Sequence, residues 1–299
     1  MNRIGAASIL PAMKAAPEER VPRVSVVIPS LDGYRDGFVP RLLESIERQT
    51  FRDYELHIVQ GVVPQGKALN QGAAQARGVI LLILDDDTCL ADETVFERLV
   101  AALDADPSIG MAGASIVLPP HASAFQRKAA AQFPRFNMPV VDAVTDSDFC
   151  CHGCCALPLA LFNAVGRERE DILRGLDPDL RVRIRHAGYR VVLVPGARVY
   201  HPMPDGWRPL LRTFFRNGFG SAYARKFHPD CVYETHERTE AAGFKPQTSL
   251  PYRMARFPLR LLRAIVEGKY IRFAAYCAYA MGYGWGMFTA EEIRLADTS

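Results

Sequence analysis

Short apolar runs alternate with amphipathic segments along the first hundred or so residues, and this alternation constrains the fold more than any other feature. The run at 24–28 is β-branched and ends at Pro29, which is typical of a strand buried on both faces. We expect strands at 24–28, 54–59, 79–84 and 109–117, and helices at 38–49, 67–77 and 93–103. Strands and helices that alternate at this spacing predict βαβ units, and therefore an α/β fold with a parallel sheet.

The pattern changes twice farther along the chain. Residues 118–148 show little periodicity and are expected to form long loops, after which regular signals return. We expect a strand at 149–157, a helix opened by Pro158, a helix at 179–186 and a strand at 190–194. The chain is therefore divided into a tail or linker at 1–20, an α/β domain at 21–202, and a basic amphipathic helical extension at 203–299.

In parallel sheets, ligands bind beyond the carboxyl ends of the strands. Pro29, Ser30, Gln60 and Gly61 follow the first two expected strands, and an acidic cluster at 85–87 follows the third. These residues should lie along one edge of the sheet.

The acidic cluster is the strongest local signal, because the apolar run at 81–84 leads directly into Asp85, Asp86 and Asp87. Three carboxylates at the end of a buried strand repel one another. A divalent cation such as Mg²⁺ or Mn²⁺ offsets that repulsion and bridges carboxylates to phosphates. The alternative is an acidic turn that caps the following helix.

Charge and cysteine content suggest partners and a compartment. The net charge of +3 hides an asymmetry, with 17 basic and 24 acidic residues up to Leu180, and 19 basic and 9 acidic residues after it. The basic final third suggests a polyanionic partner: a phosphate-bearing substrate, an anionic membrane surface or nucleic acid. Seven cysteines and no apolar leader run in residues 1–20 favour a reducing cytoplasm.

Several motifs occur in an order that resembles a known family. The chain carries VSVVIPS at 24–30, GKALNQGAAQARG at 66–78, LLILDDDT at 81–88, a glycine at Gly153, and DPDLRVRIRHAGYRVVLVPGARVYH at 177–201. Together they resemble the inverting glycosyltransferases of family two, over roughly residues 23–202. The resemblance implies a GT-A fold, with a Rossmann-type, mostly parallel sheet flanked by helices, and a nucleotide-diphosphate-sugar as donor.

The resemblance also implies a metal site in the acidic cluster. Asp85 and Asp87 match the DxD pair, in which Asp87 binds Mn²⁺ or Mg²⁺ and Asp85 contacts the metal or the nucleotide ribose. Asp86 belongs to the same nucleotide-sugar-binding turn. His201 matches a histidine that could supply a third metal ligand, although a lone histidine beside a proline is also a common structural feature.

An inverting transfer needs a carboxylate that deprotonates the acceptor hydroxyl. By resemblance this general base is Asp177, although Leu176 stands where the family has a glutamate. Asp179 matches an aspartate at the start of the helix, where it would be the N-cap near the acceptor. The alternative is that both aspartates only cap a turn around Pro178.

The remaining binding residues follow from the same matches. The resemblance places Pro29, Ser30, Lys67 and Asn70 toward the donor nucleotide. Gln60 stands where the family has an acidic residue, and an amide can still pair with a uracil or thymine edge. His152 and Gly153 are expected to border the acceptor pocket.

A cysteine-rich stretch around His152 also permits a zinc site. It contains Cys150, Cys151, Cys154 and Cys155. Neighbouring cysteines on a strand point to opposite faces, so four of them cannot easily converge on one ion. We therefore favour small buried residues over a zinc site.

The helical extension carries the features of an interfacial helix. Arg253, Arg256, Arg260 and Arg263 recur every three or four residues, which gathers them on one helical face. The alternative is a solvated basic face packed on the domain. The uncharged stretch at 273–290 could be an embedded hairpin, a buried helix or a dimer contact, and membrane-peripheral association is favoured over a spanning helix.

These features together predict an inverting glycosyltransferase that uses Asp177 as base and a DxD-bound metal. By analogy, the acceptor is a saccharide or lipid-linked saccharide of a cell-envelope polymer, and the enzyme works in the cytoplasm or on the inner face of the membrane. Nucleic acid is not an expected partner, because no recognition module is visible. The rivals are a non-catalytic scaffold that binds nucleotide-sugar or membrane, and a metal-dependent phosphoryl-transfer enzyme.

Overall fold

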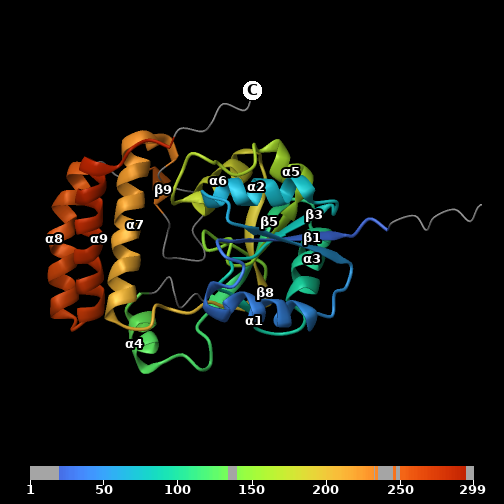
Figure 1. Ribbon diagram of the computed structural model, residues 1–299, viewed down its shortest axis with the longest axis horizontal. Helices are drawn as coiled ribbons and strands as arrows, with labels where there is room; N and C mark the ends of the chain where they lie inside the picture. Colours follow the sequence, from blue (N-terminus) through green and yellow to red (C-terminus); the bar gives the residue numbers. More distant parts are fainter. Residues whose placement is uncertain (1–19, 134–139, 232, 235–244, 247–249, 294–299) are drawn as a thin grey trace, which may run out of the picture.

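The structure is a computed structural model that describes residues 20–133, 140–231, 233–234, 245–246 and 250–293. The expected tail at 1–20 lies outside these residues except for Arg20. A sheet between two layers of helices forms one part of the molecule, and a layer of long helices forms the other (Figure 1).

The sheet contains the expected strands and some that were not expected. Five strands run in one direction: β1 (Val24–Ser30), β2 (Tyr54–Gln60), β3 (Ile80–Ile83), β5 (Ile109–Val117) and β8 (Arg190–Tyr200). Three run the other way: β4 (Cys89–Leu90), β6 (Thr145–Asp146) and β7 (Cys155–Pro158). The order is β2-β1-β3-β7-β5-β8-β4, and β6 pairs with β8. The predicted α/β fold with a mostly parallel sheet is confirmed.

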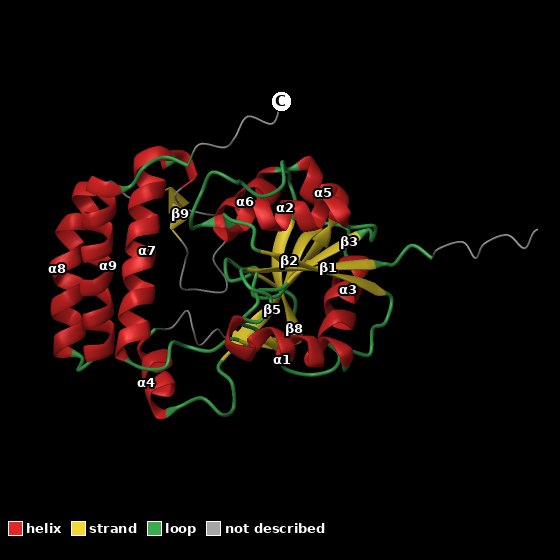
Figure 2. Ribbon diagram, viewed as in Figure 1, coloured by secondary structure: helices red, strands yellow, loops and turns green. Residues whose placement is uncertain are grey.

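Helices cover both faces of this sheet (Figure 2). One face carries α1 (Phe38–Glu47) and α3 (Val95–Ala105), and the other carries α2 (Gln65–Gln75), α5 (Leu159–Ala164) and α6 (Leu176–His186). The α2 helix packs closely because Gly72 faces the sheet, where a Cβ atom would stand 2.4 Å from Cγ1 of Val27.

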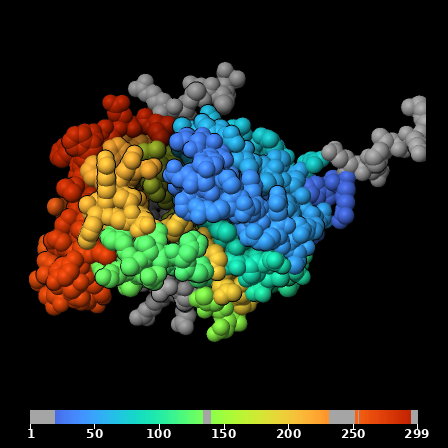
Figure 3. Space-filling model, turned by 60° about the horizontal axis from the view of Figure 1, so that its bottom comes forward, coloured from blue at the N-terminus to red at the C-terminus, as the bar shows by residue number. Residues whose placement is uncertain are grey.

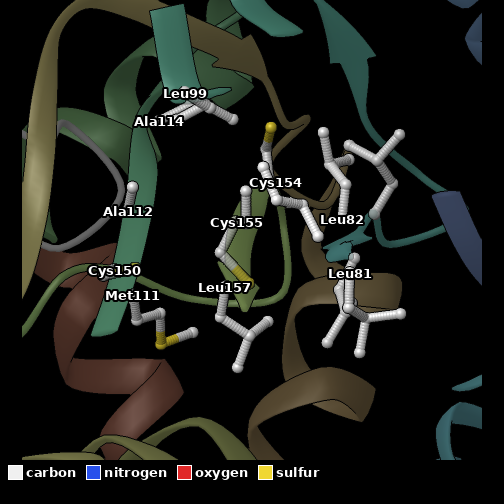
Figure 4. Packing of buried hydrophobic residues seen from close by; sticks show 14 of the residues in the cluster. Leu81, Leu82, Leu99, Met111, Ala112, Ala114, Cys150, Cys154, Cys155 and Leu157 are labelled. Atoms are coloured by element: carbon white, nitrogen blue, oxygen red, sulfur yellow. The ribbon is translucent and has the colours of Figure 1, made fainter. Parts of the chain in front are cut away.

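The main core lies between the sheet and its helices. Its members are the aliphatic residues of β1, β3, β5 and β8 together with the inner faces of α1 and α3. Figure 4 shows Cys150, Cys154 and Cys155 among these residues, beside Met111 and Leu157. Burial of apolar surface at this interface is the main stabilising contribution to the domain.

A second core holds the C-terminal helices together. It joins α7 (Trp207–Phe227) and α9 (Tyr270–Thr289) to α4 (Ala124–Gln132) through Phe133, Leu210 and Ile271. In Figure 3 the green surface around α4 lies against the gold surface of α7. The third long helix, α8 (Leu250–Val266), packs on α9. A short pair, β9 (Tyr233–Glu234) and β10 (Lys245–Pro246), is antiparallel.

Glycines allow α7 and α9 to approach closely. A Cβ atom at Gly218 would stand 2.0 Å from the carbonyl oxygen of Tyr279, and one at Gly282 would stand 2.0 Å from that of Phe215. The stretch at 273–290 is therefore mostly helical and packs on α7 along one face, while Met281, Trp285 and Phe288 are exposed. Within the described ranges, no helix is both long and apolar enough to cross a membrane.

Several expected boundaries were wrong. The segment at 118–148 is not all loop, because Ser123 and Gln126 form a capping box that opens α4. The expected strand at 149–157 begins only at Cys155. The α6 helix begins at Leu176 with Gly175 as its N-cap, so the predicted N-cap role of Asp179 was also wrong.

Candidate functional site

The ends of β1, β2 and β3 meet at one edge of the sheet, as predicted. Ser30 at the end of β1 is in register with Gln60 at the end of β2, and β3 pairs with β1 on the other side. The backbone N–H of Leu84 donates to the carbonyl of Val27, which places the acidic cluster directly beside the end of β1. Residues from three strands therefore share this edge.

The loop after β1 folds back over this edge. Ser30 Oγ accepts from the N–H of Gly33 at 3.1 Å and also hydrogen-bonds to the Asp86 carboxylate. Gly33 has a φ of +70°, and Gln60 lies against it, since a Cβ atom there would be 2.2 Å from Gln60 Nε2. Pro29, the last residue of β1 before Ser30, is half-buried. Ser30 and Gln60 therefore both lie against Gly33 of this loop.

Asp85 lies where negative charge accumulates. Its Oδ1 accepts from Gln65 Nε2 at 2.9 Å. Burial raises the pKa of Asp85 to about 6, and the negative charges of Asp87 and Asp177 add to this rise. One of these carboxylates, Asp87, is a neighbour in the same cluster, and the other, Asp177, comes from a distant part of the chain.

Asp87 has the opposite electrostatic setting. Its Oδ2 accepts from Arg35 at 2.8 Å, and its Oδ1 lies 3.3 Å from His201 Nε2. Burial opposes ionisation of Asp87, but the hydrogen bond and charge of His201, with Arg35, hold its pKa at about 2. Burial also lowers the pKa of His201, but the Asp87 carboxylate outweighs that effect and raises it. Arg35 reaches Asp86 as well, at 3.1 Å.

Asp177 lies in the first turn of α6 with one oxygen held from behind. Its Oδ1 accepts from the backbone N–H of His152 at 2.6 Å and lies 3.3 Å from Nδ1 of the same residue. The side chain is 34% exposed. A carboxylate at a helix N-terminus is favoured by the helix dipole. Asp177 is therefore an ionisable group fixed at the border of the acidic cluster.

His152 lies behind Asp177 and is 1% exposed. Its Nε2 is 3.0 Å from Oε1 of Glu168, which is itself buried. Burial alone would lower the pKa of His152, but Asp177 and Glu168 raise it to about 10.

Asn70 holds Glu168 rather than a ligand. Its amide accepts from the N–H of Glu168 at 2.9 Å and donates to the carbonyl of Glu168 at 2.9 Å. It also donates to the carboxylate of Glu170. Lys67, on the same helix, is exposed. Of the two polar residues predicted to face the donor from α2, only Lys67 has a side chain turned to solvent.

The residues expected to contact an acceptor are buried. Asp179 is 2% exposed and pairs with Arg183 at 2.7 Å on the next turn of α6. Gly153 is buried, and a Cβ atom there would be 3.1 Å from Cδ1 of Ile116. Together with the burial of His152, this argues against direct contact between these three residues and an acceptor.

The zinc alternative for the cysteine-rich stretch gains no support. Cys150, Cys154 and Cys155 are buried in the main core, and burial raises the pKa of the Cys154 and Cys155 thiols. Among the residues that the structure describes, no three His, Cys, Asp or Glu side chains are grouped to hold a metal ion.

Four residues of this region were not predicted from the sequence. They are Arg35, Gln65, Glu168 and Arg174. Burial and the nearby positive charge of Arg216 lower the pKa of Arg174 below its ordinary value. The negative charges of Asp85 and Asp177 offset only part of this effect. Arg35 has a φ of +45°, outside regular helix and strand geometry. Hydrophobic periodicity in the sequence therefore does not predict where its side chain points. The available signal was a cationic residue in the loop after the first expected strand, whose end was expected at the same sheet edge as the three aspartates.

Comparison with known proteins identifies relatives of this chain. The family described as "Glycosyltransferase like family 2" matches residues 18–220. An uncharacterized glycosyltransferase of Haemophilus influenzae is 33% identical over 109 residues, a match that spans 29% of this chain and 36% of that protein.

A solved structure shares the architecture. It is the mannosyltransferase PcManGT from Pyrobaculum calidifontis in complex with GDP-Man and Mn²⁺, which is similar with a TM-score of 0.57 and 17% identity. The similarity covers 89% of this chain and 88% of that one. At this identity the likeness shows the fold.

Proposed function

The chain belongs to the glycosyltransferase family 2-like proteins and has a GT-A fold, and from this premise we propose that it is an inverting glycosyltransferase. It would move a sugar from a nucleotide-diphosphate-sugar to a hydroxyl group of a saccharide or lipid-linked acceptor. The observation that carries the proposal is the convergence of Asp85 and Asp87, after β3, with Asp177 at the start of α6. These carboxylates lie at the sheet edge where ligands of α/β proteins bind.

Asp177 is the proposed general base. In an inverting transfer, the acceptor oxygen forms a bond to the anomeric carbon while its proton moves to the carboxylate. The bond from the anomeric carbon to the diphosphate breaks, and its electron pair leaves with the diphosphate. Asp177 suits this role because its carboxylate is held in place but remains about one-third exposed.

The proposed donor site follows the same edge. Pro29, Ser30 and Gln60 form its floor, and Asp85 and Asp86 border it. Lys67 contributes a positive charge from α2. Arg35 and Arg174 add cationic groups that fit a diphosphate.

A divalent metal fits the residues present. Asp85 and Asp87 offer carboxylate oxygens that suit Mn²⁺ or Mg²⁺, and His201 Nε2 contacts Asp87, although these three side chains are not grouped as a ligand set in the described structure. Such ions are commonly held by one or two carboxylates plus substrate phosphates, so a complete protein cage is not required. When bound, the metal would neutralise charge on the leaving diphosphate. The Mn²⁺ and GDP-Man in the structure of the similar mannosyltransferase support this assignment.

The C-terminal helices support an acceptor at a membrane surface. On α8, the side chains of Leu259, Leu262 and Val266 are exposed beside the exposed Arg256, Arg260 and Arg263. On α9, Met281, Trp285 and Phe288 are exposed, and Phe288 is 89% exposed. The side chain of Arg253 lies outside what the structure describes. Apolar and cationic groups on one hairpin suit the headgroup region of an anionic lipid layer, and we propose peripheral association there, with a cell-envelope saccharide as acceptor.

A screen of nucleotide-sugars tests the proposed function. Thermal shift with and without Mn²⁺ identifies the donor, because a ligand that binds the native state raises its stability. NMR of the transfer product should then show an anomeric configuration opposite to that of the donor. A donor that binds without transfer or hydrolysis would instead indicate a scaffold, and transfer of phosphate would indicate a phosphoryl-transfer enzyme.

A further inference from the structure

Behind Asp177 lies a chain of charged groups that the proposed chemistry does not use directly. It runs from Glu168, in the loop between α5 and α6, through His152 to Oδ1 of Asp177, with separations of 3.0 Å and 3.3 Å. The Glu168 side chain has no exposed surface, and that of His152 is 2% exposed. This row of three side chains therefore begins in the interior at Glu168 and ends at the part-exposed Asp177.

The geometry defines the protonation of the His152 ring. Each ring nitrogen faces a carboxylate oxygen, Nε2 facing Glu168 and Nδ1 facing Asp177. Where both carboxylates are ionised they can only accept hydrogen bonds, and this arrangement then favours a proton on both ring nitrogens, in line with the raised pKa of His152. A ring in that state is an imidazolium between two carboxylates and does not take a proton from Asp177.

Glu168 is itself held on both sides. The Asn70 amide from α2 bonds to the N–H and to the carbonyl of Glu168, which fixes the backbone of this residue in its loop. Holding the backbone at both groups leaves the carboxylate directed at His152. Three separate segments thus cooperate to place one ring.

Stability alone does not explain this arrangement. Buried ionic groups are commonly replaced by apolar residues of similar volume at no cost to stability, or with a gain. An oriented base backed by a third group is, in contrast, a common device in active sites. Asp177, the part-exposed end of this row of side chains, is the residue proposed to remove the acceptor proton.

We infer that His152 and Glu168 are positioning residues for Asp177. Glu168 holds the His152 ring, and His152 holds Oδ1 of Asp177 through its backbone N–H and its ring. The carboxylate then meets the acceptor hydroxyl in one orientation. This inference rests on the proposed role of Asp177 as general base.

Kinetics of His152→Gln and Glu168→Gln test the inference. His152→Gln keeps the backbone N–H but removes the ring, and misplacement of the base should lower kcat by about 10²-fold with the donor KM unchanged. Glu168→Gln should lower kcat by about 10-fold, as the loss of an outer supporting group does. His57→Gln is the matched control, because His57 also faces a carboxylate, Glu55, at 3.3 Å but lies on β2 away from Asp177.

The double variant Asp177→Asn/His152→Gln separates positioning from a general structural role. If His152 acts through Asp177, the double variant should be no slower than Asp177→Asn. Additive losses, or a kcat of His152→Gln within about twofold of wild type, would overturn the inference. If His152→Gln does not fold, the same comparison is made with Glu168→Gln.

A readout that does not need activity distinguishes failure of this inference from failure of the proposed function. If wild type transfers no sugar, the proposed function fails, and ¹⁵N NMR of the His152 ring at pH 8 still tests the geometry. Protonation of both ring nitrogens supports the chain of contacts, and one unprotonated nitrogen overturns it.

Discussion

At the scale of single residues, three consecutive aspartates acquire three different environments. Asp85 is crowded by other carboxylates, Asp86 is buried against Ser30 and Arg35, and Asp87 is paired with Arg35 and His201. The sequence predicted that the cluster stands at a strand end, because the apolar run before it is unbroken. It could not predict Arg35, which approaches from a distant part of the chain, whereas the resemblance had already pointed to His201.

The prediction for Asp87 concerns metal-linked binding. Asp87→Ala should remove the Mn²⁺-dependent part of nucleoside-diphosphate affinity, because a proposed ligand is lost, while leaving the fold intact. Isothermal titration calorimetry with and without Mn²⁺ measures this. Asp104→Ala is a matched control, since Asp104 also pairs with an arginine, Arg23, but at the opposite end of β1. Unchanged Mn²⁺-dependent affinity in Asp87→Ala would show that the DxD assignment is wrong.

The binding residues show where residue-level prediction ends. Asn70 was expected to face the donor. Its amide both donates and accepts, so it can bind backbone groups as well as a ligand, and here it bonds to the N–H and the carbonyl of Glu168. His152 was expected at the acceptor pocket, but it lies one layer deeper. Residue type and position along the chain do not distinguish a group in a cleft from the group that supports it.

At the scale of elements, the strands were predicted best. The continuous β-branched run of β1 predicted a buried strand, and β1, β2 and β5 all lie within two residues of their expected ranges, although β2 is a part-exposed edge strand. The α4 helix was missed because its apolar face is mostly small alanines, although the Ser123 and Gln126 capping box was visible. The antiparallel insertion of β7 between β3 and β5 could not be predicted, because strand order depends on tertiary pairing.

One element-level contact links stability to pH. Glu55 on β2 accepts from Ser25 Oγ on β1 at 2.6 Å and from Arg77 just before β3. Burial opposes its ionisation, but these hydrogen bonds hold the pKa of Glu55 at about 2. Because the folded pKa lies below the ordinary value of 4.5, the ionised group stabilises the fold above pH 4.5, and this stabilisation is lost as pH falls toward 2.

Glu55→Gln should therefore lower the free energy of unfolding at pH 7 by about 2 kcal/mol. The difference from wild type should shrink as pH falls from 4.5 toward 2. Urea denaturation at several pH values measures this, and Glu44→Gln, on an exposed position of α1, controls for the loss of one negative charge. A difference that does not change with pH would contradict the linkage.

At the scale of the whole molecule, a sheet domain is joined to a layer of three long helices. The sequence predicted a helical extension, but α4 comes from the segment assigned to the first domain and packs in the core of that layer. Such a contact joins residues far apart in the chain, so periodicity alone does not reveal it. The exposed apolar side chains of α8 and α9, with the exposed arginines of α8, form the surface of this layer that we propose contacts lipid.

Binding to vesicles tests that surface. Changing Arg256, Arg260 and Arg263 to Glu should lower partitioning onto phosphatidylglycerol-containing vesicles by on the order of 100-fold, because each basic side chain contributes about 1 kcal/mol near an anionic surface. Sedimentation measures this, and binding by wild type should weaken as salt rises.

The matched control changes Arg41, Arg48 and Arg52 to Glu, since these are exposed arginines on or just after α1. This control should partition as wild type does. Salt-independent pelleting, or an equal loss in the control, would contradict a charge-assisted lipid surface on α8.

The most direct test of the central claim is the kinetics of Asp177→Asn. Asparagine keeps the size of the side chain and can still accept from the His152 N–H, so it removes the base and little else. The rate of sugar transfer should fall by about 10² to 10⁴-fold, with donor affinity unchanged. Asp179→Asn, on the same turn, should change turnover less and mainly lower thermal stability through its pair with Arg183. Near-normal turnover of Asp177→Asn with unchanged donor affinity would contradict the account, because Asp177 would then be only a structural residue of the first turn of α6.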